Sequence, residues 1–209
     1  MAVDMPLARG PITERRVSDN AVSRVYGARK CGTHSPSAER PGWIAAALRD
    51  GFAAAGFALS TTTIQSPALI EVYPHPALVE LAQSAERLPY KISRIGKYWP
   101  DCKAPERRGR LLAEWRKIVG MLDAQIGGVR DMLPEPSETA RSYVLKSYED
   151  CTDAVVCAWV GVCALEDSAT AYGDDFSAIW IPSPPTRRRE ILTTDRLPDD
   201  ILEAIKNAR

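Results

Sequence analysis

Three acidic residues stand where the surrounding sequence is apolar. Asp4 lies in a short apolar stretch, Glu71 lies within the best apolar run, and Asp153 begins the most apolar segment of the chain. A buried carboxylate must be paired, protonated or bound to a cation. Clustered carboxylates bind hard divalent cations, and two such ions about 4 Å apart can promote phosphodiester hydrolysis. If these residues converge, they predict a Mg²⁺ or Mn²⁺ site.

Helical spacing supports this chemistry for the segment 149–165. It places Asp150 and Asp153 on one face, with Gly161 further along that face, so the helix could lie close to a sheet. Asp150 is therefore a further candidate metal ligand. The alternative is that Glu149, Asp150 and Asp153 begin the helix and complement its dipole.

The other two acids also have alternatives. Asp4 could be only a solvated strand end. Glu71 has the strongest functional claim of the three, because a structural role in the middle of an apolar strand needs a buried basic partner. If the three acids hold the metal of a phosphodiesterase, replacing Glu71 by Gln should abolish metal-dependent cleavage.

Basic and aromatic residues alternate in the segment 86–101. Its cations and rings are suited to holding a phosphate backbone while bases stack, so Lys91 and Arg94 are candidate substrate-binding residues. A solvated connector anchored by aromatic rings is an equally good interpretation. The residues concerned are Arg87, Tyr90, Lys91, Arg94, Lys97, Tyr98 and Trp99.

The pattern of apolar residues predicts an α/β protein that is rich in helices. We expect strands at 2–7, 68–73 and 178–182, and helices at 11–26, 41–55, 75–85, 105–126, 149–165 and 199–206, with a further helix opening at 135. A sheet of so few strands is marginal by itself. Further strands must be hidden in residues 57–66, or the sheet is incomplete.

Composition limits the classes of function. The 209 residues carry 27 basic and 27 acidic side chains, and this zero net charge argues against nonspecific coating of nucleic acid. Two histidines and five dispersed cysteines offer no zinc-ligand spacing, and an odd number of cysteines without a secretory signal predicts reduced thiols in the cytoplasm. No apolar run reaches the roughly 18 residues that span a bilayer, so we expect no membrane association.

Several short stretches occur in an order that resembles a known family. They are Ala2-Val3-Asp4-Met5-Pro6-Leu7, Ile70-Glu71-Val72-Tyr73-Pro74-His75-Pro76, Leu88-Pro89-Tyr90-Lys91, Tyr98-Trp99-Pro100, Asp150-Cys151-Thr152-Asp153-Ala154 and Ala178-Ile179-Trp180-Ile181-Pro182. Together they resemble the predicted ribonuclease H-like nucleases of domain of unknown function 429, from residue 2 to about residue 182.

The resemblance implies a ribonuclease H-like mixed sheet flanked by helices, with Asp4, Glu71 and Asp153 in its acidic centre. Asp19 and Lys91 match further polar positions of the family pattern, so we expect Asp19 near the substrate. The implied domain covers residues 1–185, and 186–209 form a polar tail with a short helix. Mg²⁺ or Mn²⁺ is the implied cofactor and nucleic acid the implied partner.

One departure from the family pattern concerns the start of the domain. The family begins with a three-strand meander whose first strand carries an Asp, and this chain has no counterpart, so we expect an N-terminally truncated sheet. A truncated sheet leaves an open edge that could join a second copy.

Three functions therefore stay open: a metal-dependent nuclease, a catalytically inactive ribonuclease H-like binding or interaction protein, and an enzyme that binds a small phosphorylated ligand through Lys91 and Arg94. An in-frame upstream strand carrying an Asp would favour the first function. Binding of free nucleotides without cleavage of polymers would favour the third.

Overall fold

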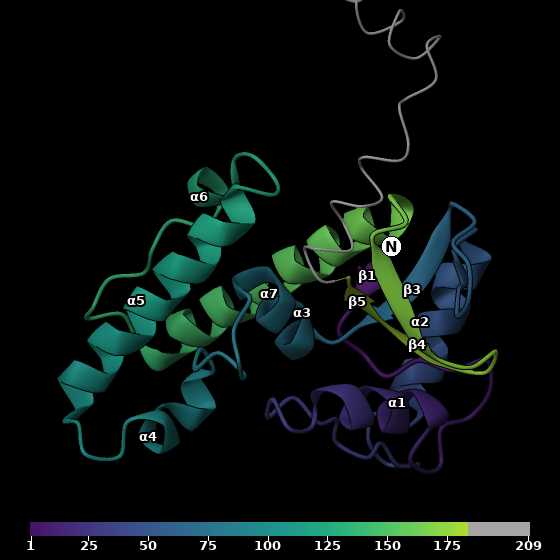
Figure 1. The fold of residues 1–209 in the computed structure, drawn as a ribbon, viewed down its shortest axis with the longest axis horizontal. Coiled ribbons are helices and arrows are strands. Elements are labelled where there is room, and N and C mark those ends of the chain that lie inside the picture. Colours follow the sequence, from purple (N-terminus) through teal and green to yellow (C-terminus); the bar gives the residue numbers. More distant parts are fainter. Residues whose placement is uncertain (184–209) are drawn as a thin grey trace, which may run out of the picture.

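A computed structural model describes residues 1–183, which fold into one mixed sheet with helices on both faces (Figure 1). The strands are β1 (Ala2–Val3), β2 (Ala58–Leu59), β3 (Ala68–Val72), β4 (Ala169–Gly173) and β5 (Ala178–Pro182). The helices of this region are α1 (Val17–Tyr26), α2 (Trp43–Ala54), α3 (Pro74–Ala82), the 3-10 helix η1 (Ile92–Arg94), α4 (Ile95–Tyr98), α5 (Ala104–Asp123), α6 (Val129–Met132) and α7 (Ser142–Leu165).

The sheet is centred on β3 and β5. Its order is β1-β3-β5-β4, and β2 pairs with the first two residues of β3. Strands β1, β2 and β5 run parallel to β3, whereas β4 runs antiparallel to β5. The predicted α/β class with a mixed sheet is confirmed.

Alternation along β3 divides the sheet into two faces. Ile70 and Val72 belong to the largest core cluster, with residues of α3, α5 and α7. Leu69 belongs to a different cluster, with Leu7, Leu59 and apolar residues of α2. Because successive strand residues point to opposite faces, Glu71 lies on the same face as Leu69. That face is covered by α2 and, over β4 and β5, by α1.

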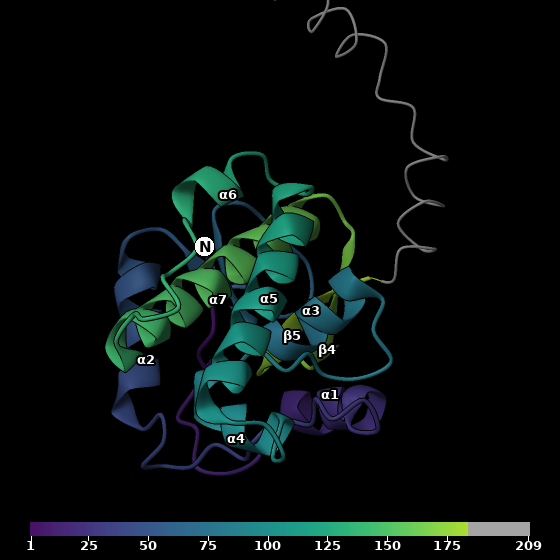
Figure 2. The same ribbon diagram turned by 90° about the vertical axis from the view of Figure 1, so that its left-hand side faces the viewer.

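Helices α4, α5 and α6 form a layer on the opposite side of the molecule from α1 and α2 (Figures 1 and 2). The helix predicted at 105–126 is confirmed as α5, and its inner stripe of Leu111, Trp115, Ile118, Val119 and Leu122 is buried. This stripe packs in the same core cluster as buried residues of α7. Helix α7 therefore lies between the sheet and α5.

Helix α7 differs from the prediction in where it begins. It starts at Ser142, seven residues before Glu149, and runs to Leu165 without interruption. Glu149, Asp150 and Asp153 are therefore in the interior of the helix and are not its first turn. The cap interpretation is wrong for these acids, because the helix dipole acts only within the terminal turns.

Two further outcomes concern the strands. The prediction missed β4, whose sequence Ala-Thr-Ala-Tyr-Gly is only partly apolar and half-buried. Strand β2 does lie in the interval 57–66, where hidden strands were one of two alternatives. The helix expected at 199–206 and the polar tail lie outside the described residues.

Among the helices of residues 1–183, none is long and apolar enough to cross a membrane.

Candidate metal centre

Three carboxylates of α7 form the base of the candidate site. Glu149, Asp150 and Asp153 each offer an oxygen atom, and these atoms all lie within 4.8 Å of one another. Their spacing of one, three and four residues places them on one side of the helix. Glu149 and Asp153 are buried, whereas Asp150 is exposed. The arrangement offers hard oxygen donors on a rigid element with one side open to solvent.

A fourth carboxylate, that of Asp4, comes from the end of β1. Ala2 pairs with Ile70 and packs close to α7, where a Cβ atom on Gly161 would stand 3.4 Å from the Cβ of Ala2. The close approach brings Asp4 beside the acids of α7. The residue keeps contact with solvent, but the surrounding protein and the negative charge of Asp153 raise the pKa of Asp4 to about 6. No hydrogen bond or ion pair to Asp4 occurs within residues 1–183.

Two lysines supply positive charge to the acids of α7. The ammonium group of Lys91 contacts Asp153 and lies 3.5 Å from Oε1 of Glu149. That of Lys146 lies 3.1 Å from the same Glu149 oxygen and contacts Asp150. Lys91 is largely buried, with 16% of its side chain exposed. Four carboxylates thus face two ammonium groups, which leaves an excess of two negative charges.

Neutral donors fix the orientation of the two buried acids. The Tyr90 hydroxyl donates to Oδ1 of Asp153 at 2.7 Å, and the backbone N–H of Ile92 donates to Oε2 of Glu149 at 2.7 Å. Trp115 donates in turn to the backbone carbonyl of Tyr90 at 2.8 Å. Burial raises the pKa of Asp153, and Lys91 and Tyr90 oppose this rise by favouring the ionised form. The segment 90–92 is therefore anchored between α5 and α7.

Glu71 belongs to a separate buried network with Arg16 and Asp19. Nη1 and Nη2 of Arg16 donate to the two Glu71 oxygens at 2.6 and 2.8 Å. Nε and Nη2 of Arg16 also donate to Asp19, each at 3.0 Å, and Nη1 donates to the carbonyl of Leu7 at 2.7 Å. All five guanidinium N–H groups are thereby satisfied. Arg16 is the buried basic partner that a structural role for Glu71 requires.

The structure thus brings together only part of the predicted set. Asp4 and Asp153 lie close enough for their charges to interact, and Asp150 is beside them. Glu71 lies on the other face of the sheet, and the charges that shift its pKa come from Arg16 and Asp19. Burial raises the pKa of Glu71 to about 7, while Arg16 and the N–H of Leu7 oppose that rise. Neighbouring strands were expected to bring these acids together, but alternation along the strand separates them.

The two basic residues predicted to bind substrate, Lys91 and Arg94, lie in different sites. Lys91 lies in the acidic cluster, whereas Arg94 lines a cavity with Arg87 and Lys97. Asp19, expected near the substrate, is 2% exposed and forms an ion pair with Arg16. Glu149 was expected only as an acid at the start of a helix, and Lys146 was not predicted at all, although their spacing of three on α7 was a usable signal. Arg16, three residues before Asp19, gave a similar signal.

Comparison with known families identifies the class of protein. A model for the family described as "Protein of unknown function (DUF429)" matches residues 1–177, and the chain belongs to this family. No curated protein matches the chain, and no solved structure matches it. The predicted membership in domain of unknown function 429 is confirmed.

Proposed function

We propose that this protein is a divalent-cation-dependent phosphodiesterase of the ribonuclease H-like type, acting on nucleic acid. The observation that carries the proposal is the cluster of Glu149, Asp150 and Asp153 on α7, together with Asp4 after β1, whose charge interacts with those of Asp153 and Asp150. Among the described residues, two ammonium groups, those of Lys91 and Lys146, contact the acids of the helix. A mixed sheet that carries one acid after a strand and others on the packed helix supports the proposed type.

The donor set fits Mg²⁺ or Mn²⁺. Carboxylate oxygens are the ligands that these hard ions prefer, and the excess of two negative charges equals the charge of one divalent cation. Asp4 and Asp153 are the proposed ligands, with Glu149 and Asp150 beside them. A bound ion would polarise a phosphodiester and neutralise the charge that develops on it.

The chain's own residues prepare the site. Tyr90 and Ile92 each occupy one carboxylate oxygen of Asp153 and Glu149, which fixes the orientation of both groups. Each carboxylate oxygen has two lone pairs, so these acids keep acceptor capacity beyond their existing hydrogen bonds. The ammonium group of Lys91 bridges Asp153 and Glu149. The site is thus preorganised by residues from the segment 90–92.

A second candidate function is a non-catalytic binding or interaction protein. The observation that favours it is that Lys91 and Lys146 already contact three of the four acids. In this case the acids and lysines form an ion-pair network that stabilises the fold. The two candidates differ in whether the protein binds a divalent cation.

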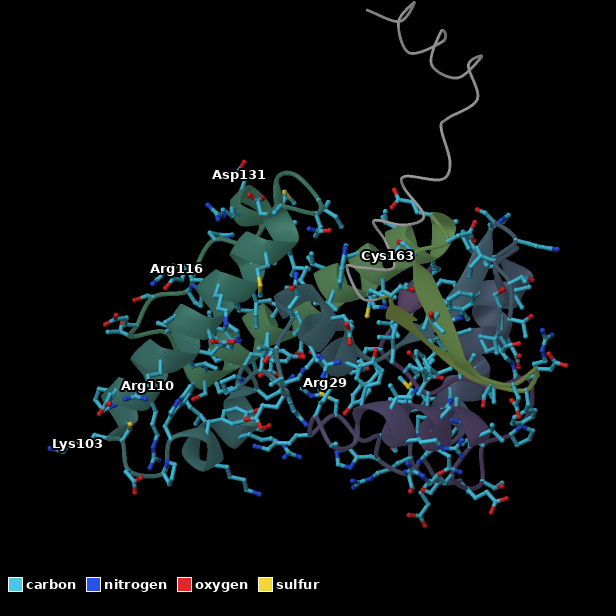
Figure 3. The ribbon with its side chains drawn as sticks, viewed as in Figure 1. Arg29, Lys103, Arg110, Arg116, Asp131 and Cys163 are labelled. Carbon is cyan, nitrogen blue, oxygen red and sulfur yellow. The ribbon has the colours of Figure 1, made fainter. Side chains whose placement is uncertain are left out.

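A titration with Mn²⁺ in chelator-treated buffer tests the proposal. We expect the melting temperature to rise by on the order of 5 °C at about 100 times the dissociation constant, because a ligand of the native state stabilises it by about 2.7 kcal/mol at that concentration. The variant Asp153→Asn should lose this shift. Asp131→Asn is the matched control, because Asp131 is exposed on α6, at the outer end of the helical layer (Figure 3).

Cleavage is measured on labelled single-stranded DNA and RNA with Mn²⁺. We expect the wild type and Asp131→Asn to cleave one of them, and Asp153→Asn to be inactive. A wild type that shows no Mn²⁺ shift would establish the non-catalytic network instead. A wild type that binds Mn²⁺ and cleaves neither polymer would overturn the phosphodiesterase assignment.

A further inference from the structure

A second polar feature involves the chain segment that also carries Lys91 of the acidic cluster. It is a cavity of about 350 Å³ between α4 and the residues that precede η1. Its volume is in the range of small-ligand sites, which is about 300–1,000 Å³. The lining residues include Lys30, Glu86, Arg87, Arg94, Lys97 and Tyr98.

The charge of this cavity is strongly positive. Lys30 pairs with Glu86 at 2.5 Å, so one cation is compensated. Arg87, Arg94 and Lys97 have no acidic partner anywhere in residues 1–183. Three uncompensated cations around one hollow form a site for an anion, because the surrounding protein focuses their field.

Two polar atoms in the cavity wall lack partners. Nε of Arg87 and the hydroxyl oxygen of Tyr98 are both buried, and neither makes a hydrogen bond within the described part of the chain. A buried donor without an acceptor costs about 1–3 kcal/mol, so native proteins seldom leave one unused. Both atoms belong to residues that line the cavity, and an anion bound there would offer acceptor oxygens to them.

The chain path links this cavity to the acidic site. Lys91 turns toward Asp153, whereas Arg87 and Arg94, four residues before and three after it, line the cavity. The positive field of these three residues also reaches the buried His75, where it contributes to lowering the pKa. A group held by Arg94 is therefore close to the segment that orients the carboxylates.

We propose that this cavity binds a phosphate group of the substrate, with Arg87, Arg94 and Lys97 as the anion-binding residues. A phosphate offers the acceptor oxygens that guanidinium groups match. The inference rests on the proposed function, because it makes the cavity the place where the substrate of the acidic site is held. The phosphate could belong to a free nucleotide or to a nucleic acid strand.

Calorimetric titration in buffer containing a metal chelator tests this inference separately from the metal site. The probes are inorganic phosphate, adenosine monophosphate and a ten-residue single-stranded oligonucleotide. Arg94→Gln and Lys97→Gln should each weaken binding roughly tenfold, the loss expected for one charge-assisted hydrogen bond. Each should also reduce the slope of log K against log salt for the oligonucleotide by about 0.7. Both residues keep solvent contact, so the variants should fold.

Arg116→Gln is the matched control. Arg116 is 66% exposed on the outer side of α5 (Figure 3), and its loss should leave binding unchanged. Tighter binding of the oligonucleotide than of the monophosphate would identify a strand as the ligand, and equal binding a single phosphate group. Absence of binding for all three probes, or wild-type affinity in both variants, would overturn the inference. It would leave the Mn²⁺ result unaffected, since the chelator keeps metal out of this experiment.

Discussion

Arg16 holds Glu71 through two parallel hydrogen bonds on the face of the sheet opposite to Asp153. Both residues are buried, with 6% and 4% of their surfaces exposed. A guanidinium and a carboxylate in this geometry form one of the strongest polar pairs in proteins. The pair stabilises the junction between the N-terminal segment and β3, and Glu71 has no contact with the acids of α7.

Replacing Glu71 by Gln should therefore affect stability and not metal binding. We expect the free energy of unfolding to fall by about 3 kcal/mol, because Arg16 loses a buried charged partner while Asp19 remains. Urea denaturation measures this loss, and the Mn²⁺-induced shift of the melting temperature should persist. An undiminished stability combined with a lost Mn²⁺ shift would instead make Glu71 a metal ligand.

Asp4→Asn should have the opposite profile. Within the described residues Asp4 receives no hydrogen bond, so its replacement removes no stabilising contact and relieves repulsion from Asp153. We expect unchanged or slightly higher stability without metal, and Mn²⁺ affinity lower by roughly tenfold or more. Parallel melting curves with and without Mn²⁺ measure both quantities. Wild-type Mn²⁺ affinity in this variant would exclude Asp4 from the site.

Lys91→Gln tests whether the lysine ammonium group compensates the same negative charges as a bound divalent metal ion. Its removal leaves Asp153 and Glu149 with less positive charge, so we expect a loss of about 2 kcal/mol in metal-free buffer. Mn²⁺ should restore part of this loss and raise the melting temperature by more than it does in the wild type. A shift no larger than that of the wild type would show that Lys91 and the ion do not compensate the same charges.

His75 predicts a pH dependence. It packs edge-on against Tyr73 and Tyr90, with ring centroids 5.4 and 5.2 Å away, and its Nδ1 makes no hydrogen bond within residues 1–183. Burial and the positive charges of Arg87, Lys91 and Arg94 lower its pKa well below the ordinary 6.5, with His34 adding to the effect. Below pH 6.5 the unfolded chain therefore binds a proton that the native protein does not. The free energy of unfolding consequently decreases as the pH is lowered.

The variant His75→Phe removes this effect. We expect its stability to be close to that of the wild type at pH 8 and higher at pH 5, with the gap growing by up to about 1.4 kcal/mol per pH unit below 6.5. Urea denaturation at several pH values measures the gap. A constant difference between the two proteins across this range would contradict the assignment of a neutral buried imidazole.

The sequence predicted the elements that have strong local signals. The stripe Leu111, Trp115, Ile118 and Leu122 fixes a helix by its period, and Ile70 and Val72 fix a strand by alternation. Strand β4 has no such signal in its sequence. It forms because it pairs along its whole length with β5, and such pairing is not visible in the local sequence. The start of α7 was misplaced because Tyr143 and Val144 are exposed and the helix begins without an acidic or side-chain cap.

The candidate site was predictable only in part. Sequence spacing places Asp150 and Asp153 together, since both lie on one helix. The approach of Asp4 depends on Ala2 packing near Gly161, a contact between residues far apart in the chain. The pairing of Glu71 with Arg16 spans 55 residues, and no local pattern predicts which cation a buried acid will find.

The position of β3 between the two polar networks has a consequence for how this protein can vary. Substitutions in the Arg16–Glu71 pair and in the Lys91–Asp153 pair share no contact, so their energetic effects should add. Stability lost on one face can therefore be regained there without altering the acids on the other. Such independence allows the acidic residues on the α7 face to change while the Arg16–Glu71 pair continues to stabilise the sheet.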